Sequence, residues 1–280
     1  MNLREEIENK YNQLSKGQQK VAKYLVENPR DFAVKSASEI GGHVGVSETT
    51  VIRFCYSIQL TGFSELQKMV REQLLNTKSS LGQYFSDKLE LAEHPYFFAK
   101  VMEQDCRHIH ETIQNINEKD FDKAVDQLVK TETIYVSGLR TSFSAASWLA
   151  FTLRLARGNV HLFRPDTDDL LLTISEMNEK STLIAISFHR YLKETIKTAQ
   201  LAKEQGAFVI GITDSPVAPI REYADILFQI CSSGNSTIDS APVLFSFLNA
   251  MVAGVSINDQ KQFEERKERY EKLDGDYFFI

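Results

Sequence analysis

The chain has 280 residues, of which 42% are hydrophobic and 25% are charged, with a formal net charge of −6. This length fits one or two domains, and the composition excludes disordered and fibrous proteins because it supplies a sizeable core. The acidic balance excludes a protein that coats nucleic acid along its whole length, although a small basic face remains compatible with it.

The sequence offers no sign of secretion or of a bound metal. The first residues, Met1 to Glu6, carry charges where a signal peptide needs an apolar run. The longest uncharged stretch, residues 241–258, contains polar side chains and is interpreted as a helix buried against a sheet. The three cysteines lie far apart, which argues against a disulfide framework or a thiolate metal site. A cytoplasmic protein without metal, cofactor or membrane partner is expected.

Short helices separated by turn signals are predicted at the front of the chain. Ser15 is a plausible N-cap for a helix over residues 18–27, which Asn28-Pro29 ends. Ser36 and Glu39 have the spacing of a capping box, and they open a short helix through His43.

A helix-turn-helix follows from the next residues. Gly45 stands where a tight turn needs positive φ, and Ser47 caps a helix over residues 48–58. Beyond it, Ser64 and Gln67 repeat the capping-box spacing and predict a fourth helix.

The helix over residues 48–58 has the character of a DNA-reading helix. Its apolar positions form one buried stripe, and short hydroxyls with one arginine face outward, which suits entry into the major groove. The predicted DNA-binding residues are Ser38, Ser47, Glu48, Thr49, Thr50, Arg53, Ser57 and Lys68. The alternative is a helical hairpin that packs on the second domain, with the serines and threonines serving only as caps.

Several motifs of residues 1–77 resemble the N-terminal domain of the RpiR family of bacterial transcription regulators. They are Leu14-Ser-Lys, Ala22-x-Tyr-Leu-x-x-Asn-Pro29, Gly45-Val-Ser-x-x-Thr-Val-x-Arg-Phe-Cys55 and Gly62-Phe63. The resemblance implies a winged-helix-like domain that binds a palindromic double-stranded DNA operator as a homodimer or a higher homo-oligomer. The chain departs from the family at Ile58-Gln-Leu-Thr61, where a basic residue and Gly-Phe are frequent.

The rest of the chain predicts an α/β domain after a small polar linker over residues 78–95. Short β-rich runs alternate with helical windows, which is typical of a doubly wound, mainly parallel five-stranded sheet. The predicted strands cover residues 134–136, 160–163, 183–186, 209–213 and 226–230. The expected domains are therefore residues 1–77, residues 96–260, and a charged helix with an apolar tail over 261–280.

Two loops of this domain are candidate ligand sites. Ligands of doubly wound sheets bind beyond the carboxyl ends of strands, which here places the loops 137–142 and 187–191 near each other. Hydroxyl-rich loops that enter helix N-termini favour anions.

The same segment, over roughly residues 96–257, resembles the SIS (sugar isomerase) domain that the RpiR family carries after its DNA-binding domain. Matching pieces include Gly138-x-x-x-Ser142, Ser187 and Ala202-Lys-x-x-Gly206. The resemblance implies binding of a phosphosugar and a role in dimerisation.

The loops also depart from that family. Arg140 and Arg190 stand where SIS loops usually have glycine, and His189 replaces a serine. Paired guanidinium groups bind phosphate or carboxylate, so a small anionic metabolite is the expected effector. The predicted ligand-binding residues are Ser137, Gly138, Arg140, Ser142, Ser187, His189, Arg190 and Thr195.

Three alternatives stay open. Arg140 and Arg190 could instead form ion pairs with the aspartates at 166, 168 or 169. The domain could be a sugar-phosphate isomerase-type enzyme, because His189 and Glu194 lie in the right region for a base. The chain could also be a regulator that has lost its ligand. No catalytic residue is assigned.

Overall fold

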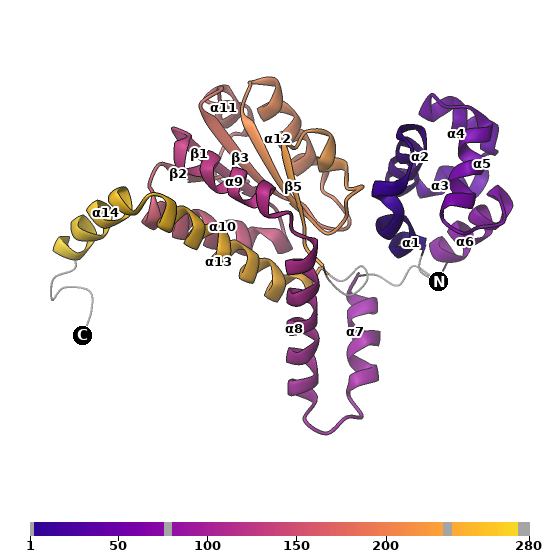
Figure 1. Cartoon of the computed structure of the whole chain (residues 1–280), viewed down its shortest axis with the longest axis horizontal. Coiled ribbons are helices and arrows are strands. Elements are labelled where there is room, and N and C mark those ends of the chain that lie inside the picture. The colour runs from indigo at the N-terminus through magenta and orange to yellow at the C-terminus, as the bar shows by residue number, and fades with distance from the viewer. Residues whose placement is uncertain (1–2, 76–79, 232–236, 274–280) are drawn as a thin grey trace. The chain divides into compact units, whose positions relative to one another are not determined.

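The computed structural model describes residues 3–75, 80–231 and 237–273, and the apolar tail predicted at 277–280 lies outside them. The chain divides into two compact units (Figure 1). The first comprises Met1–Ser79 together with Ser215–Arg221, and the second comprises Ser80–Asp214 and Glu222–Ile280. Each unit has its own hydrophobic core.

The first unit is all-helical, and its helices begin where capping residues predict. Its elements are α1 (Leu3–Lys10), η1 (Tyr11–Gln13), α2 (Lys16–Glu27), α3 (Pro29–Val34), α4 (Ala37–Val44), α5 (Glu48–Ser57) and α6 (Phe63–Leu75). Ser15 and Ser36 form the N-terminal capping boxes of α2 and α4, and Ser47 caps α5 by accepting a hydrogen bond from the amide of Thr50. Gly45 has a φ of 73°, so the predicted turn is confirmed.

Two details of this unit differ from the prediction. Pro29 ends α2 but also begins α3, because proline at the first helical position lacks only an amide that would be unpaired anyway. The capping box predicted for Ser64 and Gln67 is wrong. The carboxylate of Glu65 instead accepts hydrogen bonds from the amide and hydroxyl of Thr61, and the Gln67 side chain donates to backbone carbonyls.

The second unit contains the predicted five-stranded parallel sheet, in the order β2-β1-β3-β4-β5. The strands are β1 (Thr133–Gly138), β2 (Val160–Leu162), β3 (Ser181–Ile186), β4 (Phe208–Thr213) and β5 (Ile226–Gln229). Because β3 returns beside β1 on the side opposite β2, a crevice is expected at the carboxyl ends of β1 and β3.

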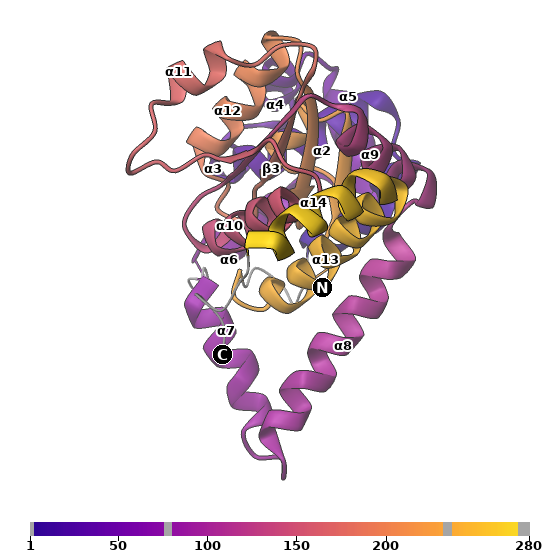
Figure 2. The ribbon, with the colours of Figure 1, turned by 90° about the vertical axis from the view of Figure 1, so that its left-hand side faces the viewer.

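Helices cover both faces of this sheet (Figure 2). On one face, α9 (Glu118–Lys130), α10 (Thr141–Ala156) and α13 (Ser240–Asn258) close the main core, and on the other lie α11 (Leu170–Ser175) and α12 (Lys193–Glu204). The remaining elements are η2 (Pro219–Glu222) and α14 (Gln260–Leu273). The guanidinium of Arg266 on α14 donates to the carbonyls of Arg154 and Leu155, near the C-terminus of α10.

One helix in the described part of the chain, α13, is long and apolar enough to cross a membrane. Its side chains nevertheless include core residues such as Leu248, Met251 and Val255, which are at most 1% exposed. The interpretation of this segment as a buried core helix accounts for those contacts.

A helical hairpin occupies the region where the linker was expected. Residues 80–91 form α7, which is followed by α8 (Phe97–Asn115). In Figures 1 and 2 the two helices project together from the sheet of the second unit. The sequence Leu81-Gly-Gln-Tyr-Phe85 places apolar side chains at helical spacing, which the small polar residues before it obscure.

Candidate functional site

The first candidate site is the exposed face of α5. Val51, Phe54, Cys55 and Ile58 are fully buried, so the apolar stripe predicted from the sequence is confirmed. Thr49 and Arg53 are exposed on the opposite side of the helix, and Glu48 is exposed at its first position. This face can therefore enter a groove without disturbing the core.

The other predicted DNA-binding residues lie at the two ends of α5 and on the neighbouring helices α4 and α6. Ser47 and Thr50 hydrogen-bond each other at the start of α5, with 3.0 Å between their hydroxyl oxygens. Ser38 on α4 and Lys68 on α6 are exposed. The Ser57 hydroxyl is already engaged, because it accepts from Gln18 and donates to the carbonyl of Arg53.

An aromatic residue on this face was missed from the sequence. The side chain of Tyr56 is 57% exposed, and it follows Thr49, Ile52 and Arg53 at helical spacing on the same stripe. The spacing of Tyr56 from Thr49 and Arg53 places it on the exposed face, but a tyrosine can equally belong to the apolar side of a helix.

A polar cluster fastens the helices that support α5. The carboxylate of Asp31 on α3 accepts hydrogen bonds from the Tyr24 hydroxyl and from the Lys35 ammonium. Nζ of Lys35 also lies 2.9 Å from Nε2 of His43. The hydrogen bond to Asp31 raises the pKa of Tyr24 to about 12, and Lys35 holds the pKa of Asp31 below its usual range. The cluster therefore joins α2, α3 and α4.

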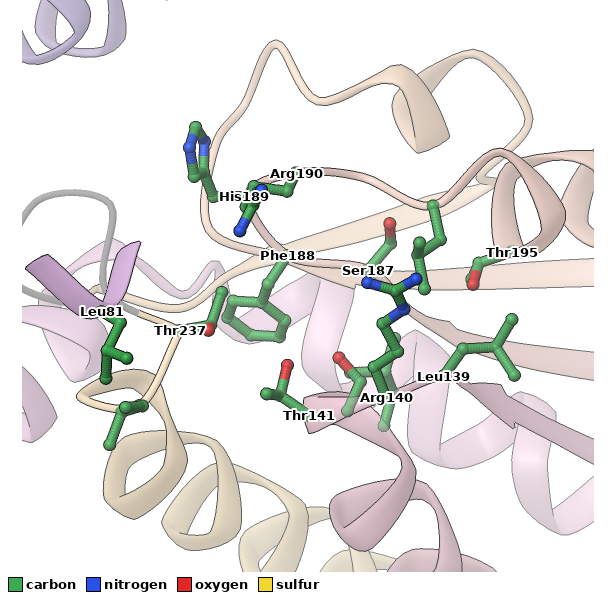
Figure 3. A pocket seen from close by; sticks show the side chains of 14 residues that line it. Leu81, Leu139, Arg140, Thr141, Ser187, Phe188, His189, Arg190, Thr195 and Thr237 are labelled. Atoms are coloured by element: carbon green, nitrogen blue, oxygen red, sulfur yellow. The ribbon is translucent and has the colours of Figure 1, made fainter. Parts of the chain in front are cut away.

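The second candidate site is a pocket of about 270 Å³ in the second unit (Figure 3). It lies at the carboxyl ends of β1 and β3, where the topology predicts a ligand crevice. Its lining residues are Leu81, Leu139, Arg140, Thr141, Ser142, Ile186, Ser187, Phe188, His189, Arg190, Leu192, Thr195, Thr237 and Ile238. None of these fourteen side chains carries a carboxylate, so the pocket favours negative charge.

Both pocket arginines have a backbone conformation that favours glycine. The φ angles are 53° at Arg140 and 67° at Arg190, in the left-handed region that costs side-chain-bearing residues about 1–3 kcal/mol. Neither guanidinium forms an ion pair with another described residue. Asp168 instead accepts a hydrogen bond from the amide of Arg164, and Asp169 caps α11. Two strained residues thus hold unneutralised positive charge at the pocket.

Unpaired hydrogen-bonding groups also face this region. The Ser187 side chain is 4% exposed, and its hydroxyl has no partner among the described residues. The helices α10 and α12 both begin at the pocket, and neither first turn receives a side-chain cap. Buried polar groups normally have partners, so this arrangement is suited to an anion that accepts several hydrogen bonds.

The carboxylate of Asp214 holds the loop that carries Arg190 through two hydrogen bonds. One carboxylate oxygen of Asp214 accepts from the amide of His189 and the other from the hydroxyl of Tyr191, at 2.9 and 3.0 Å. The His189 ring points away from Arg140 and Thr141 (Figure 3). Asp214 therefore holds the loop in place while the histidine lies toward the outer side of the pocket.

The structure brings six of the eight predicted ligand-binding residues to the pocket lining, namely Arg140, Ser142, Ser187, His189, Arg190 and Thr195. Ser137 and Gly138 lie within β1 and do not line it. Leu81, Thr237 and Ile238 were missed, because they come from segments far away in the sequence that only the tertiary fold brings together. Within the described residues, no group of histidine, cysteine and acidic side chains could hold a metal ion.

Comparison with known proteins assigns both units to described families. The rpiR-family helix-turn-helix domain matches residues 1–77, and the SIS domain matches residues 127–254. The regulator HexR of Pseudomonas aeruginosa is 26% identical over 96% of this chain and 94% of its own length. HexR of Escherichia coli is 26% identical over 79% of this chain and 75% of its own length.

Solved structures show the same fold. NanR of Vibrio vulnificus, complexed with ManNAc-6P, has a TM-score of 0.60 at 18% identity and covers 98% of this chain and 100% of its own. The sugar isomerase domain of an RpiR transcription factor from Sphaerobacter thermophilus has a TM-score of 0.59 at 20% identity, over 62% of this chain and 98% of its own.

Proposed function

The chain belongs to the RpiR family of helix-turn-helix transcriptional regulators with a SIS domain, and from this membership we propose that it binds an operator as a dimer under the control of a small anionic metabolite. The pocket that holds Arg140, Arg190 and the Ser187 hydroxyl is the observation that carries the effector assignment. The exposed face of α5 supports the DNA assignment.

The reader face suits recognition of a groove in DNA. The hydroxyls at the start of α5 can donate to phosphates, and the exposed Arg53 one turn later can bond a guanine edge with two hydrogen bonds. Two copies of the reader meet half-sites about 34 Å apart on a palindromic operator.

The pocket suits a phosphate or carboxylate group on a sugar-sized molecule. Its two guanidinium groups have no carboxylate partners, and two helix N-termini add partial positive charge. NanR is described with ManNAc-6P, which makes a phosphosugar a suitable first probe.

The effector proposal is tested by thermal shift with ManNAc-6P and with inorganic phosphate. We expect ManNAc-6P and inorganic phosphate to raise the melting temperature of the full chain. The substitutions Arg140→Ala and Arg190→Ala should abolish this rise. Arg164→Ala removes an exposed arginine outside the pocket and serves as the matched control. A rise that survives both pocket substitutions contradicts the assignment of the two arginines.

The DNA proposal is tested by selecting bound fragments from a genomic library, with and without metabolite extract. We expect recovered fragments to share an inverted repeat and their recovery to depend on the extract. Turnover of ketose or aldose phosphates without any selected fragment would support the isomerase-type alternative instead.

Fragments bound identically with and without every metabolite would support a regulator that has lost its ligand. In that case the unsatisfied Ser187 hydroxyl and the two strained arginines would need another explanation.

A further inference from the structure

Helix α2 carries a basic stripe in an otherwise acidic protein. Residues 10–26 contain four lysines and no aspartate or glutamate, whereas the whole chain has a net charge of −6. Lys16, Lys20 and Lys23 are spaced by four and three residues, so these three side chains share one face of the helix. The opposite face holds its buried residues, Val21, Ala22 and Leu25. Lysines gathered along one helix are typical of a surface that contacts nucleic acid.

The two ends of the basic stripe differ in how far their charge is neutralised. Lys23 pairs with Glu27 on the same helix, with 3.9 Å between Nζ and Oε1. Lys16 and Lys20 are exposed, and neither forms an ion pair with another residue that the structure describes. The uncompensated positive charge of the stripe therefore lies at the start of α2.

The first turn of α2 is held against α5 at two points. A Cβ built on Gly17 would lie only 3.0 Å from Cγ2 of Thr50, so the lack of a side chain at residue 17 lets the two helices approach this closely. Nε2 of Gln18 donates a hydrogen bond to the hydroxyl of Ser57 at 2.7 Å. Thr50 and Ser57 are two turns apart, roughly 10 Å along α5. These contacts fix the start of α2 along the side of α5.

The contact with α5 places the two uncompensated lysines beside the predicted reading face. Lys16 directly precedes Gly17, and Lys20 lies one turn after it on the same side of α2. Thr50, which faces Gly17, adjoins the exposed Thr49 in the first turn of α5. When a helix lies in the major groove, the phosphates of the groove walls flank it. The ammonium groups of Lys16 and Lys20 are therefore suited to meet such phosphates.

We propose that Lys16 and Lys20 bind phosphates of the operator backbone beside the groove that α5 enters. The lysine ammonium is a compact charge that donates to phosphate oxygens without recognising a base. This contact sets the position of the first unit on the duplex, while Arg53 reads the sequence. The inference rests on the proposed function, because it requires that the chain binds DNA.

The chemistry of the stripe favours a DNA backbone over a protein partner. None of the large hydrophobic side chains that are exposed in the described part of the chain belongs to α2. The buried centre of a protein interface is usually apolar and poor in lysine, whereas a phosphate backbone needs only positive charge.

The proposal is tested by the salt dependence of DNA affinity. Fluorescence anisotropy of the full chain is measured over a range of salt concentrations, with a selected genomic fragment and with a duplex of unrelated sequence. Each phosphate that a protein neutralises contributes about 0.9 to the slope of log K against log salt concentration, so Lys16→Gln combined with Lys20→Gln should reduce the slope by about 2. The affinities for both duplexes should fall by the same factor, because backbone contacts carry no sequence information.

Matched variants separate the position of the charge from the charge itself. Lys119→Gln with Lys261→Gln removes the same charge from exposed positions of the second unit and should leave the slope unchanged. Lys16→Arg with Lys20→Arg keeps the charge at α2 and should keep the slope. Each single glutamine variant should reduce the slope by about 1, so the question is decided even if the double variant fails to fold.

Two results would overturn the proposal. The first is a slope that the glutamine substitutions at α2 change no more than those in the second unit do. The second is a loss of affinity for the selected fragment alone, because the two lysines would then contact bases and not phosphates.

Failure of this contact can be told apart from failure of the proposed function. A wild-type chain that binds neither duplex, even at low salt, refutes the proposed function, and the contact from α2 falls with it. A wild-type chain that selects fragments, but whose slope does not depend on Lys16 and Lys20, refutes only the contact from α2.

Discussion

Lys88 and Asp239 form a buried ion pair, with 2.8 Å between Nζ and Oδ1 and side chains that are 10% and 5% exposed. Lys88 lies on α7, and Asp239 directly precedes α13 and follows two pocket residues, Thr237 and Ile238. The pair therefore fixes the hairpin to the segment that closes one side of the pocket.

Removing one partner of this pair should destabilise the second unit strongly. Lys88→Met leaves a buried, uncompensated carboxylate, and we expect the free energy of unfolding to fall by about 3–5 kcal/mol. Adding Asp239→Asn should recover much of this loss. Urea denaturation followed by the fluorescence of Trp148, on α10 of the same unit, measures both. In the control Lys100→Met, loss of the exposed pair with Glu103 should cost less than about 1 kcal/mol.

Arg53→Ala should weaken operator binding by roughly 1–3 kcal/mol, or about 5- to 150-fold, because it removes the proposed bidentate contact to a base edge. Fluorescence anisotropy with a selected fragment measures the effect. Arg30→Ala removes the same charge from an exposed position on α3 and should have a smaller effect. Equal losses for the two variants would show that Arg53 contributes only general charge, and that α5 is not the reading helix.

Arg190→Gly should separate strain from charge. Glycine adopts the φ of 67° without steric cost, so we expect the ligand-free protein to gain about 1 kcal/mol of stability while losing its response to phosphate probes. Arg190→Ala removes the charge but retains a Cβ, so it should lose the response without the gain. Thermal unfolding with and without ManNAc-6P distinguishes the two, and identical ligand-free stabilities would contradict the strain argument.

The thiols of Cys55 and Cys106 should differ in reactivity. Burial raises the pKa of Cys55 to about 12, so its thiol stays protonated at pH 8, whereas Cys106 is exposed. Iodoacetamide at pH 8 should therefore label Cys106 and spare Cys55 until urea is added. Because the folded pKa exceeds the unfolded value, the contribution of Cys55 to stability is complete below pH 9 and declines as the pH rises through 12. Mass spectrometry that finds Cys55 alkylated in the folded chain would contradict its burial.

The local features of the reader could be predicted because each depends on a few neighbouring residues. Ser36 with Glu39, Ser47 and Gly45 mark helix ends through hydrogen bonds and φ angles that the sequence encodes directly. Helix α7 could not be predicted in the same way. Its small polar first residues are typical of a linker, and its stability comes partly from Lys88, whose partner Asp239 is distant in the sequence.

The pocket was predictable only in part. The loops that carry Arg140 and Ser187 follow adjacent strands, so topology alone brings them together. Thr237 reaches the pocket from the turn before α13, and no periodicity in the sequence indicates that. The positive φ of Arg190 is also invisible in the sequence itself, because arginine rarely adopts it.

Leu81 lines the pocket from the first turn of α7, which is the next helix after α6 in the described part of the chain. A molecule that binds beside Leu81 thus contacts the chain where its second unit begins. Covalent continuity then provides a mechanical route by which the proposed effector acts on the proposed DNA-binding unit.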